Sequence, residues 1–247
     1  LSALGMTGVN AQNIGSIWAA IRDSADTGAG VDSLLKIQTL INNANDAPVN
    51  TVPGALTTLE DTPLVITGLS VSDADVGSSN VTVTLSVTQG TLNVAAGDNV
   101  VLGTNGTASV TLTGSVDAIN TLLASTDAVT FTPTIHTHGN AILTVSTSDG
   151  GNTGSGGTLV DTDTVAITVT PVNDAPTATD KTITVLEDGS HTFTAADFGF
   201  SDSQDNPANT LVAIIITTLP GSGALTLNDV AVTQDQVIAV ADIDQLV

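Results

Sequence analysis

An internal repeat constrains the fold of this chain more than any other feature. Asn45-Asp46-Ala47-Pro48 recurs 128 residues later as Asn173-Asp174-Ala175-Pro176. Glu60-Asp61 follows the first copy, and Glu187-Asp188 follows the second at nearly the same distance. Further along, Ser72-Asp73-Ala74-Asp75 corresponds to residues 201–205. Self-similarity with so long a period indicates tandem domains instead of a solenoid of short units.

The repeat sets the expected domain boundaries. One domain is predicted over residues 45–172 and a second over residues 173–247. The second copy ends at Val247, where the first would enter Val129-Thr130-Phe131. The second domain is therefore expected to lack its last strands at its C-terminal end. Either the sequence is an excerpt of a longer chain, or a strand from another molecule completes the domain.

Alternating side chains predict the type of secondary structure. Val81, Val83, Leu85 and Val87 alternate with Thr and Ser, which is the pattern of a strand with one buried face. In the second copy, strands are expected over 182–186 and 211–219. A short helical turn is expected over 117–123, capped by Asp117. Many short strands joined by Gly- and Asn-rich turns are typical of a β-sandwich, so the fold class is mainly β.

Residues 1–44 have helical spacing instead. We expect a helical hairpin, with Asn10 and Asp32 as the caps of its two helices. Trp18, the single tryptophan, is expected to anchor the core of this hairpin. The apolar positions that carry the helical period are Ile14, Ile17, Trp18, Ile21, Leu34, Ile37 and Ile41.

The charge balance excludes several partners. The 247 residues contain 25 Asp and Glu but three Lys and Arg, for a net charge of −22. Nucleic acid is not an expected partner, because phosphate binding needs clustered cations. Membrane insertion is not expected either, because no apolar run approaches the ~20 residues that a span needs. So many carboxylates in a folded chain require solvent, counterions or bound cations to relieve their repulsion.

The acids gather at predicted domain ends, where they could bind Ca²⁺. Calcium takes six to eight oxygen ligands from carboxylates, amides and carbonyls. Alternatively, the acids lie in loops only because loops are solvated. His136 and His138 would share one strand face and could form a zinc pair, but exposed polar histidines without a metal are the preferred interpretation. No nucleophilic Cys and no Ser–His–Asp arrangement is evident, so an enzyme is not expected.

Three segments carry a family resemblance. Residues 172–176 are similar to the linkers of cadherin-like repeats, and residues 186–189 and 198–202 resemble the opening of repeats in large type I-secreted, RTX-class bacterial adhesins. The resemblance implies cadherin-like (Ig-like) sandwiches that form a secreted, cell-surface extender, with neighbouring repeats as partners and Ca²⁺ stiffening each junction. The ligands that it implies before the first sandwich are Asn45, Asp46, Asp73 and Asp75. Those that it implies at the next junction are Glu60, Asp149, Asn173, Asp174, Asp202 and Asp205.

Two alternative functions remain at this point. The chain could be a protomer of an extracellular filament or surface layer, in which identical chains complete one another by strand exchange. A carbohydrate-binding sandwich is a third option, although four Phe and one Trp offer few rings for stacking against sugars.

Overall fold

The computed structural model describes residues 43–151 and 154–247, together with residues 9, 14–15, 17–19, 38–39 and 41. The chain divides into two compact units, Leu1–Thr170 and Pro171–Val247, and each is described by itself. Most of the predicted helical hairpin, including its proposed caps Asn10 and Asp32, lies outside the described residues.

The described residues near the amino terminus form a small apolar cluster. Residues 14–15, 17–19, 38–39 and 41 are helical. Ile17, Ile41 and Ala44 are buried together, and Val9 packs against them. Trp18 is 58% exposed, so the prediction that it anchors this core is wrong. Adjacent helical residues point about 100° apart, and here the buried direction belongs to Ile17.

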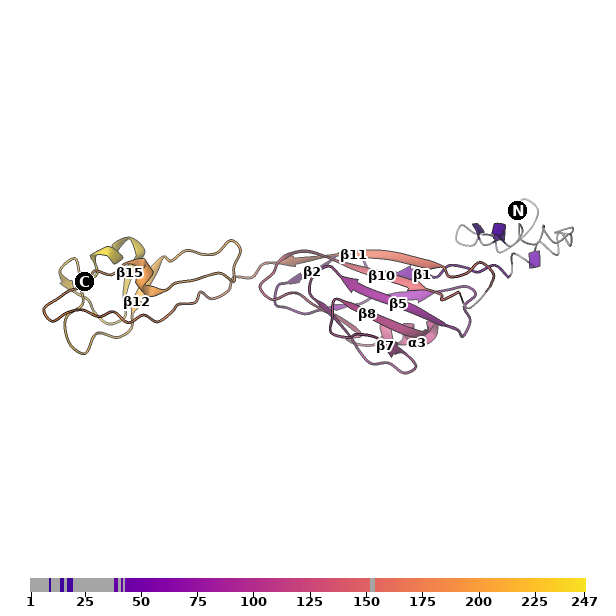
Figure 1. The fold of residues 1–247 in the computed structure, drawn as a ribbon, viewed down its shortest axis with the longest axis horizontal. Coiled ribbons are helices and arrows are strands. Elements are labelled where there is room, and N and C mark those ends of the chain that lie inside the picture. Colours follow the sequence, from indigo (N-terminus) through magenta and orange to yellow (C-terminus); the bar gives the residue numbers. More distant parts are fainter. Residues whose placement is uncertain are drawn as a thin grey trace. The chain divides into compact units, whose positions relative to one another are not determined.

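The first unit is a β-sandwich (Figure 1). One sheet has six strands in the order β2-β11-β10-β5-β8-β7, a second has three in the order β3-β9-β6, and β1 pairs with β4. The elements are β1 (Val49–Thr51), β2 (Leu56–Leu59), β3 (Leu64–Ile66), β4 (Ser70–Ser72), β5 (Asn80–Val87), β6 (Thr91–Val94), β7 (Val101–Leu102), β8 (Ser109–Ser115), α3 (Val116–Leu123), β9 (Val129–Thr132), β10 (Gly139–Ser148) and β11 (Val160–Thr170).

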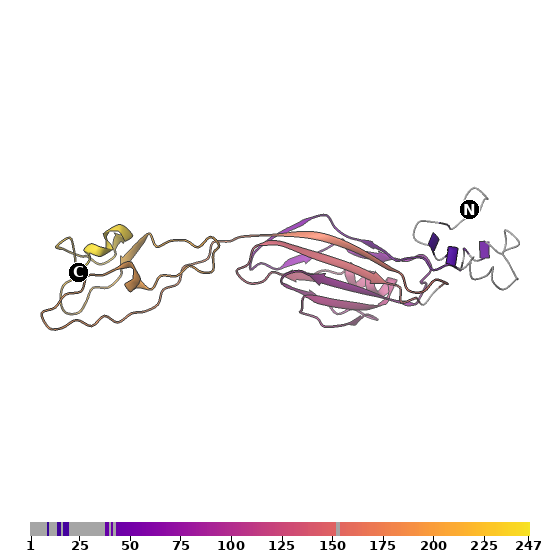
Figure 2. The same ribbon diagram turned by 45° about the horizontal axis from the view of Figure 1, so that its top comes forward.

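The alternation read from the sequence is the alternation of burial in the structure. Along β5, the apolar positions from Val81 to Val87 are buried while the Thr and Ser between them are less buried. β5 lies between β8 and β10 and is antiparallel to both, whereas β2 runs parallel to β11. Residues from both sheets, such as Leu143 and Phe131, belong to one core. Figure 2 shows the strands of this unit from a second side. The mainly β prediction is confirmed.

The helix α3 closes one side of this core. Ile119, Leu122 and Leu123 are its buried residues. Its cap is Ser115, whose side chain accepts from the Ala118 backbone N–H at 3.3 Å, so the prediction that Asp117 caps the helix is wrong. Asp117 lies instead in the first turn, where a negative charge favours the helix dipole.

The second unit has fewer strands. β12 (Ala213–Ile216) pairs with β15 (Gln236–Ala239), and β13 (Thr226–Leu227) pairs with β14 (Val230–Ala231). Two 3₁₀ helices, η2 (Ala195–Phe198) and η3 (Val240–Gln245), complete it. Its buried core residues are Ile214, Val232, Ile238, Ile243 and Leu246.

Two strand predictions fail in the second unit. Residues 182–186 form no strand, and the strand expected over 211–219 is confined to β12. The first unit supplies the physical reason. There β2, the counterpart of 182–186, is held by pairing with β11, whereas the described residues of the second unit include no strand in that position. A strand requires a partner for its backbone groups.

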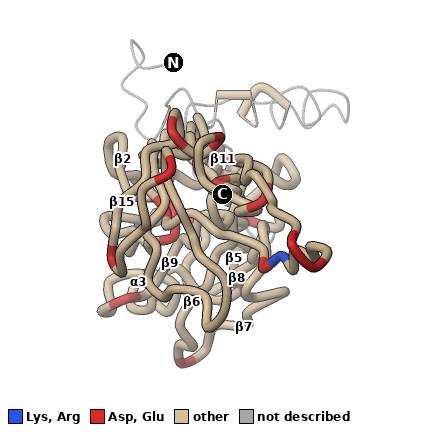
Figure 3. The backbone as a smooth tube through the Cα atoms, turned by 90° about the vertical axis from the view of Figure 1, so that its left-hand side faces the viewer, with Lys and Arg blue, Asp and Glu red and all other residues tan. Residues whose placement is uncertain are grey.

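Acidic residues lie mainly in turns and at element ends (Figure 3). Within the described residues, the acids that lie inside a strand are Asp161 and Asp163 of β11. Asp161 Oδ2 accepts from the Asn50 backbone N–H at 2.7 Å. No helix among the described residues is long and apolar enough to cross a bilayer.

Candidate cation sites

The amino-terminal end of the first sandwich is closed by a buried amide–carboxylate contact. Asn45 Nδ2 donates to Asp149 Oδ2 at 2.5 Å and to the Gly157 carbonyl at 2.7 Å. Asp149 Oδ1 accepts from the backbone N–H groups of Gly151 at 2.8 Å and Leu159 at 2.9 Å. Both Asn45 and Asp149 are fully buried. This carboxylate therefore fastens the backbone at Gly151 and Leu159 to the Asn-Asp-Ala-Pro motif.

Asp46, the residue after Asn45, belongs to an acidic cluster with Asp73 and Asp75. Its backbone N–H lies 3.3 Å from Asp75 Oδ2. Asp73 Oδ1 accepts from the backbone N–H groups of Asp75 and Val76, both at 3.1 Å. Burial raises the pKa of Asp73 to about 6, and the adjacent Asp75 side chain adds to this shift. The fold thus holds the Asp73 carboxylate where burial and the neighbouring Asp75 disfavour its charge.

Each of these two carboxylates has an oxygen with no donor. Among the described residues, nothing forms a hydrogen bond to the buried atoms Asp73 Oδ2 and Asp75 Oδ1. Burying such an oxygen without a partner is unfavourable, and a bound cation or water relieves that cost. The arrangement fits a hard cation, because all of the side-chain groups offered are oxygens.

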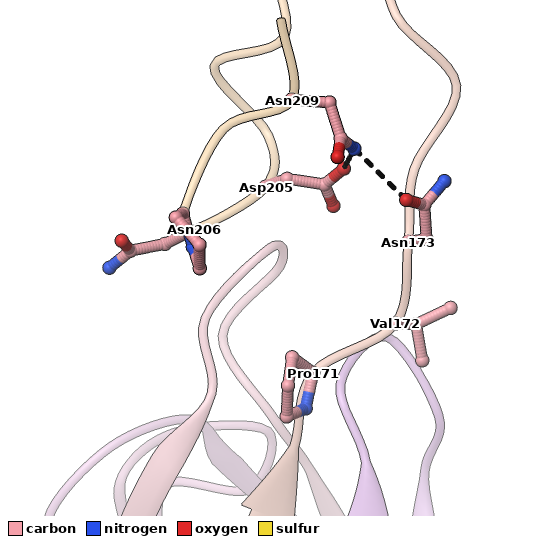
Figure 4. A pocket seen from close by; sticks show the side chains of 7 residues that line it. Pro171, Val172, Asn173, Asp205, Asn206 and Asn209 are labelled. Carbon is pink, nitrogen blue, oxygen red and sulfur yellow. Dashed lines mark hydrogen bonds between the residues drawn. The ribbon is translucent and has the colours of Figure 1, made fainter.

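The second unit has a corresponding cluster. The Asp174 backbone N–H donates to Asp205 Oδ1 at 2.9 Å. Asn209 Nδ2 donates to Asp205 Oδ2 at 2.9 Å and to Asn173 Oδ1 at 3.0 Å (Figure 4). The Asn209 backbone N–H donates to Asp202 Oδ2 at 2.6 Å.

Asp202 is the most buried acid of this cluster, with 6% of its surface exposed. Its Oδ1 has no hydrogen-bond partner among the described residues. A cavity of about 210 Å³ adjoins the cluster and is lined by Asn173, Asp205 and Asn209, among others. The side-chain oxygens Asn173 Oδ1 and Asp205 Oδ2 both face the side-chain nitrogen of Asn209, which lies between them (Figure 4).

Asn209 was missed by the sequence reasoning. A signal for it exists, because Asn209 follows Asp202 by seven residues and Asn80 follows Asp73 by the same number. Asn80 is the first residue of β5, and Asn209 lies a few residues before β12. Comparison of the two copies at single-residue resolution would have identified it.

Glu60, another predicted ligand, lies at the opposite end of the first sandwich from Asp149. The Glu60 backbone N–H donates to the Thr170 carbonyl at 2.9 Å, whereas the Asp149 backbone N–H donates to the Leu159 carbonyl at 3.2 Å. These contacts mark the two ends of the β10–β11 pair, since Gly139 faces Val169 and Ser148 faces Val160. The expected grouping of Asp149 with Glu60 at the second junction is therefore wrong, and Asp149 belongs with Asn45.

Glu60 is buried, at 2% exposure, and lies beside histidines. His138 Nδ1 is 3.8 Å from Glu60 Oε2, and His136 Nδ1 is 3.3 Å from Asp61 Oδ2. The His136 backbone N–H also donates to Asp61 Oδ1 at 2.8 Å. Both histidines are partly buried and face acids, so the expectation of exposed polar histidines is wrong.

The comparisons with known proteins add little to this geometry. No family model matches the chain, and no curated protein matches it. Among solved structures, the sixth cohesin of scaffoldin B from Acetivibrio cellulolyticus, in complex with a Cel5 dockerin mutant, matches with a TM-score of 0.31 and 14% identity. The match covers 49% of this chain and 97% of the cohesin.

Proposed function

We propose that this chain is an extender segment of a large extracellular bacterial adhesin, made of tandem cadherin-like sandwiches whose amino-terminal ends bind Ca²⁺. Its partners are neighbouring repeats of the same parent protein. The extracellular setting and the adhesin role derive from the resemblance of the Asn-Asp-Ala-Pro and Glu-Asp motifs to such repeats. The calcium part derives from the two acidic clusters.

The observation that carries the proposal is a buried, donorless carboxylate oxygen at the same motif position in both units. Asp73 Oδ2 has this character in the first unit and Asp202 Oδ1 in the second. In each unit, the second acid of the acidic loop, Asp75 or Asp205, also accepts a hydrogen bond from the backbone N–H of the aspartate in Asn-Asp-Ala-Pro. Acids that lie in loops only because loops are solvated would not be expected to bury a carboxylate oxygen without a donor at the same position in both units.

The tandem arrangement is supported by a further local match. Asp61 and Asp188, the second residues of the two Glu-Asp motifs, both adopt left-handed backbone with φ of 58° and 62°. Few non-glycine residues adopt this conformation, although Asp is among the more tolerant ones. The same turn at nearly the same distance from each Asn-Asp-Ala-Pro motif favours two copies of one domain.

Ca²⁺ would be held by Asp73, Asp75 and Asp46 in the first unit, and by Asp202, Asp205 and Asn173 in the second. Bound there, the ion supplies positive charge that a chain of net charge −22 lacks. Asp149 and Asn209 act on these ligands through hydrogen bonds, since they fasten the segments from which the ligands project.

Calcium binding is tested by isothermal titration calorimetry on the full chain and on Asp202→Asn. We expect the variant to lose one class of sites and to bind at least about tenfold more weakly there, since a neutral amide offers less charge. Asp229→Asn, in an exposed turn of the same unit, is the matched control and should bind as the parent does. Equal binding by all three proteins would refute this site.

The extender role is tested by small-angle scattering of the chain in Ca²⁺ and in EDTA. A stiffened junction predicts a larger maximum dimension and a narrower distribution of conformations with Ca²⁺. Identical scattering curves in the two buffers would rule out stiffening by calcium, even if the ion binds.

A further inference from the structure

The segment that leads into the first sandwich runs alongside β11, the last strand of that unit. Asn50 of β1 lies beside Asp161, and Leu56 of β2 lies beside Ile167, with the same separation of 111 residues at both places. The pairing of β2 with β11 is parallel. The incoming segment therefore follows β11 in one direction, from the beginning of that strand to its end at Thr170.

Asn50 links β1 to the β10–β11 pair. Its backbone N–H donates to Asp161 Oδ2 at 2.7 Å, and its side-chain amide donates to the Val145 carbonyl at 3.3 Å. The Thr147 hydroxyl donates to Asn50 Oδ1 at 2.5 Å. Asn50 is buried, and the ladder partner of β1 is β4, which lies outside the six-stranded sheet. These hydrogen bonds therefore join β1 to a sheet of which it is not a strand.

Further contacts lie on either side of Asn50. Before β1, Ala44 forms a parallel bridge with Ser155, in the connection between β10 and β11. After β1, the Glu60 backbone N–H donates to the Thr170 carbonyl at 2.9 Å. The Thr170 hydroxyl donates to the Thr58 carbonyl at 3.1 Å. All of these contacts join the incoming segment to β11 or to the connection that precedes it.

The direction of the pairing decides how these contacts respond to tension. The strand that enters the unit is pulled by its first residues and the strand that leaves it by its last, so two parallel strands slide past each other. Sliding strains all the hydrogen bonds between them at once, whereas strands pulled from the same end separate one bond at a time. β11 ends at Thr170, the last residue of the first unit. Tension between the ends of this unit therefore loads the incoming segment against β11.

We propose that the first sandwich bears tension along the chain through this contact, and that Asn50 transfers load from the incoming segment to β11. Force then passes into β11 and leaves at Thr170 without loading α3 or the three-stranded sheet. The proposal rests on the extender role only for the source of the tension, since a projecting segment is pulled through its ends. It does not depend on calcium.

Single-molecule force spectroscopy on the full chain, held by its two ends in EDTA, tests the proposal. The measured quantity is the lifetime of the first unit at constant force, which reports its unfolding rate along the direction of pull. Unfolding of this unit is recognised by a step of roughly 400 Å, longer than that of the second unit, because the step scales with the residues released. Asn50→Ala removes the side-chain hydrogen bonds of Asn50 and should shorten the lifetime at least about tenfold.

Asn105→Ala is the matched control. The Asn105 side chain also makes two hydrogen bonds to one strand, since Oδ1 accepts from the Val94 N–H at 2.8 Å and Nδ2 donates to the Val94 carbonyl at 2.7 Å. Val94 belongs to β6 of the three-stranded sheet, which the proposed path of force does not load. The control should lower the urea midpoint of the first unit, as Asn50→Ala does, yet shorten the lifetime under force less than about twofold.

Asp161→Ala tests the same contact from β11 and leaves the Asn50 side chain in place. It should shorten the lifetime at least about fivefold, and it decides the question if Asn50→Ala does not fold. Equal shortening by Asn105→Ala and Asn50→Ala would show that the lifetime follows overall stability, and would overturn the proposal. Lifetimes of Asn50→Ala and Asp161→Ala within about twofold of the parent would overturn it as well. Because calcium is absent throughout, failure of the calcium sites leaves each of these outcomes unchanged.

Discussion

Replacement of Asp73 by Asn tests how the buried negative charge of Asp73 affects the stability of the first sandwich. Asp73 Oδ1 accepts from the Asp75 and Val76 backbone N–H groups, and an Asn side chain retains an oxygen for these bonds. What the variant loses is the negative charge on Oδ2, which is buried without a donor. Asp73→Asn therefore changes charge and little else in this loop.

The magnitude follows from the pKa of Asp73. Burial, together with the Asp75 side chain, raises this pKa from 3.8 to about 6 in the folded chain. The folded state therefore holds the proton more tightly than the unfolded state does. As the pH rises from about 4 to above 6, this carboxylate lowers the free energy of unfolding by at most about 3 kcal/mol. Because the side chain is only partly buried, solvent screening reduces that figure to about 1 kcal/mol.

The assay is thermal unfolding of the first unit between pH 4 and 7.5. In EDTA at pH 7.5, Asp73→Asn should melt roughly 4 °C above the parent, and the difference should vanish toward pH 4. In Ca²⁺ the order should reverse, because the parent gains a ligand that the variant lacks. Asp98→Asn, an exposed acid in a turn of the same unit, should change neither result.

Two outcomes would refute this reasoning. If Asp73→Asn melts below the parent at pH 7.5 in EDTA, the carboxylate is a net stabilising group and its Oδ2 is well solvated. A stabilisation that persists unchanged to pH 4 would show that its origin is not the titration of Asp73.

Three further predictions concern individual contacts. Asn45→Ala removes a donor from the buried Asp149 carboxylate and should lower the free energy of unfolding of the first unit by about 2 kcal/mol, measured by urea titration. A loss below about 0.5 kcal/mol would contradict it. Gly154→Ala should cost about 1–3 kcal/mol in the same assay, since Gly154 has φ of +66° and an added Cβ would lie 2.6 Å from the Asn45 backbone nitrogen. Lys181→Met removes the ion pair that, with the Thr194 hydrogen bonds, holds the pKa of Asp197 well below its usual range. The Asp197 pKa measured by carboxyl NMR should rise in this variant, and an unchanged value would exclude the pairing.

The sequence predicted the features that repeat along one strand or between the two copies. Buried Val and exposed Thr on β5 are a local property, since one face of a strand in a sandwich is always covered. The positions of Asp73 and Asp202 in corresponding loops followed from the repeat in the same way. Both inferences needed only distances along the chain.

The failures concern features that depend on contacts across the fold. Asp149 was assigned to the wrong end of the sandwich, because sequence order does not say which end of the β10–β11 pair a turn residue occupies. Trp18 and Ile17 have equally good helical spacing, and only packing decides which is buried. Residues 182–186 have strand propensity, but a strand forms only where another backbone pairs with it.

The two acidic clusters differ in a way that shows what positions them. Asp202 and Asp205 are three residues apart, whereas Asp73 and Asp75 are two apart. In the first unit, Asp73 accepts a hydrogen bond from the backbone N–H of Asp75. In the second unit, Asp202 accepts one from the backbone N–H of Asn209. The contact from the Asn-Asp-Ala-Pro motif to the second acid is nevertheless present in both, at 3.3 Å and 2.9 Å. The incoming chain segment, and not the loop, is therefore the common element that fixes the second acid, which is why an acidic loop of either length can form the cluster.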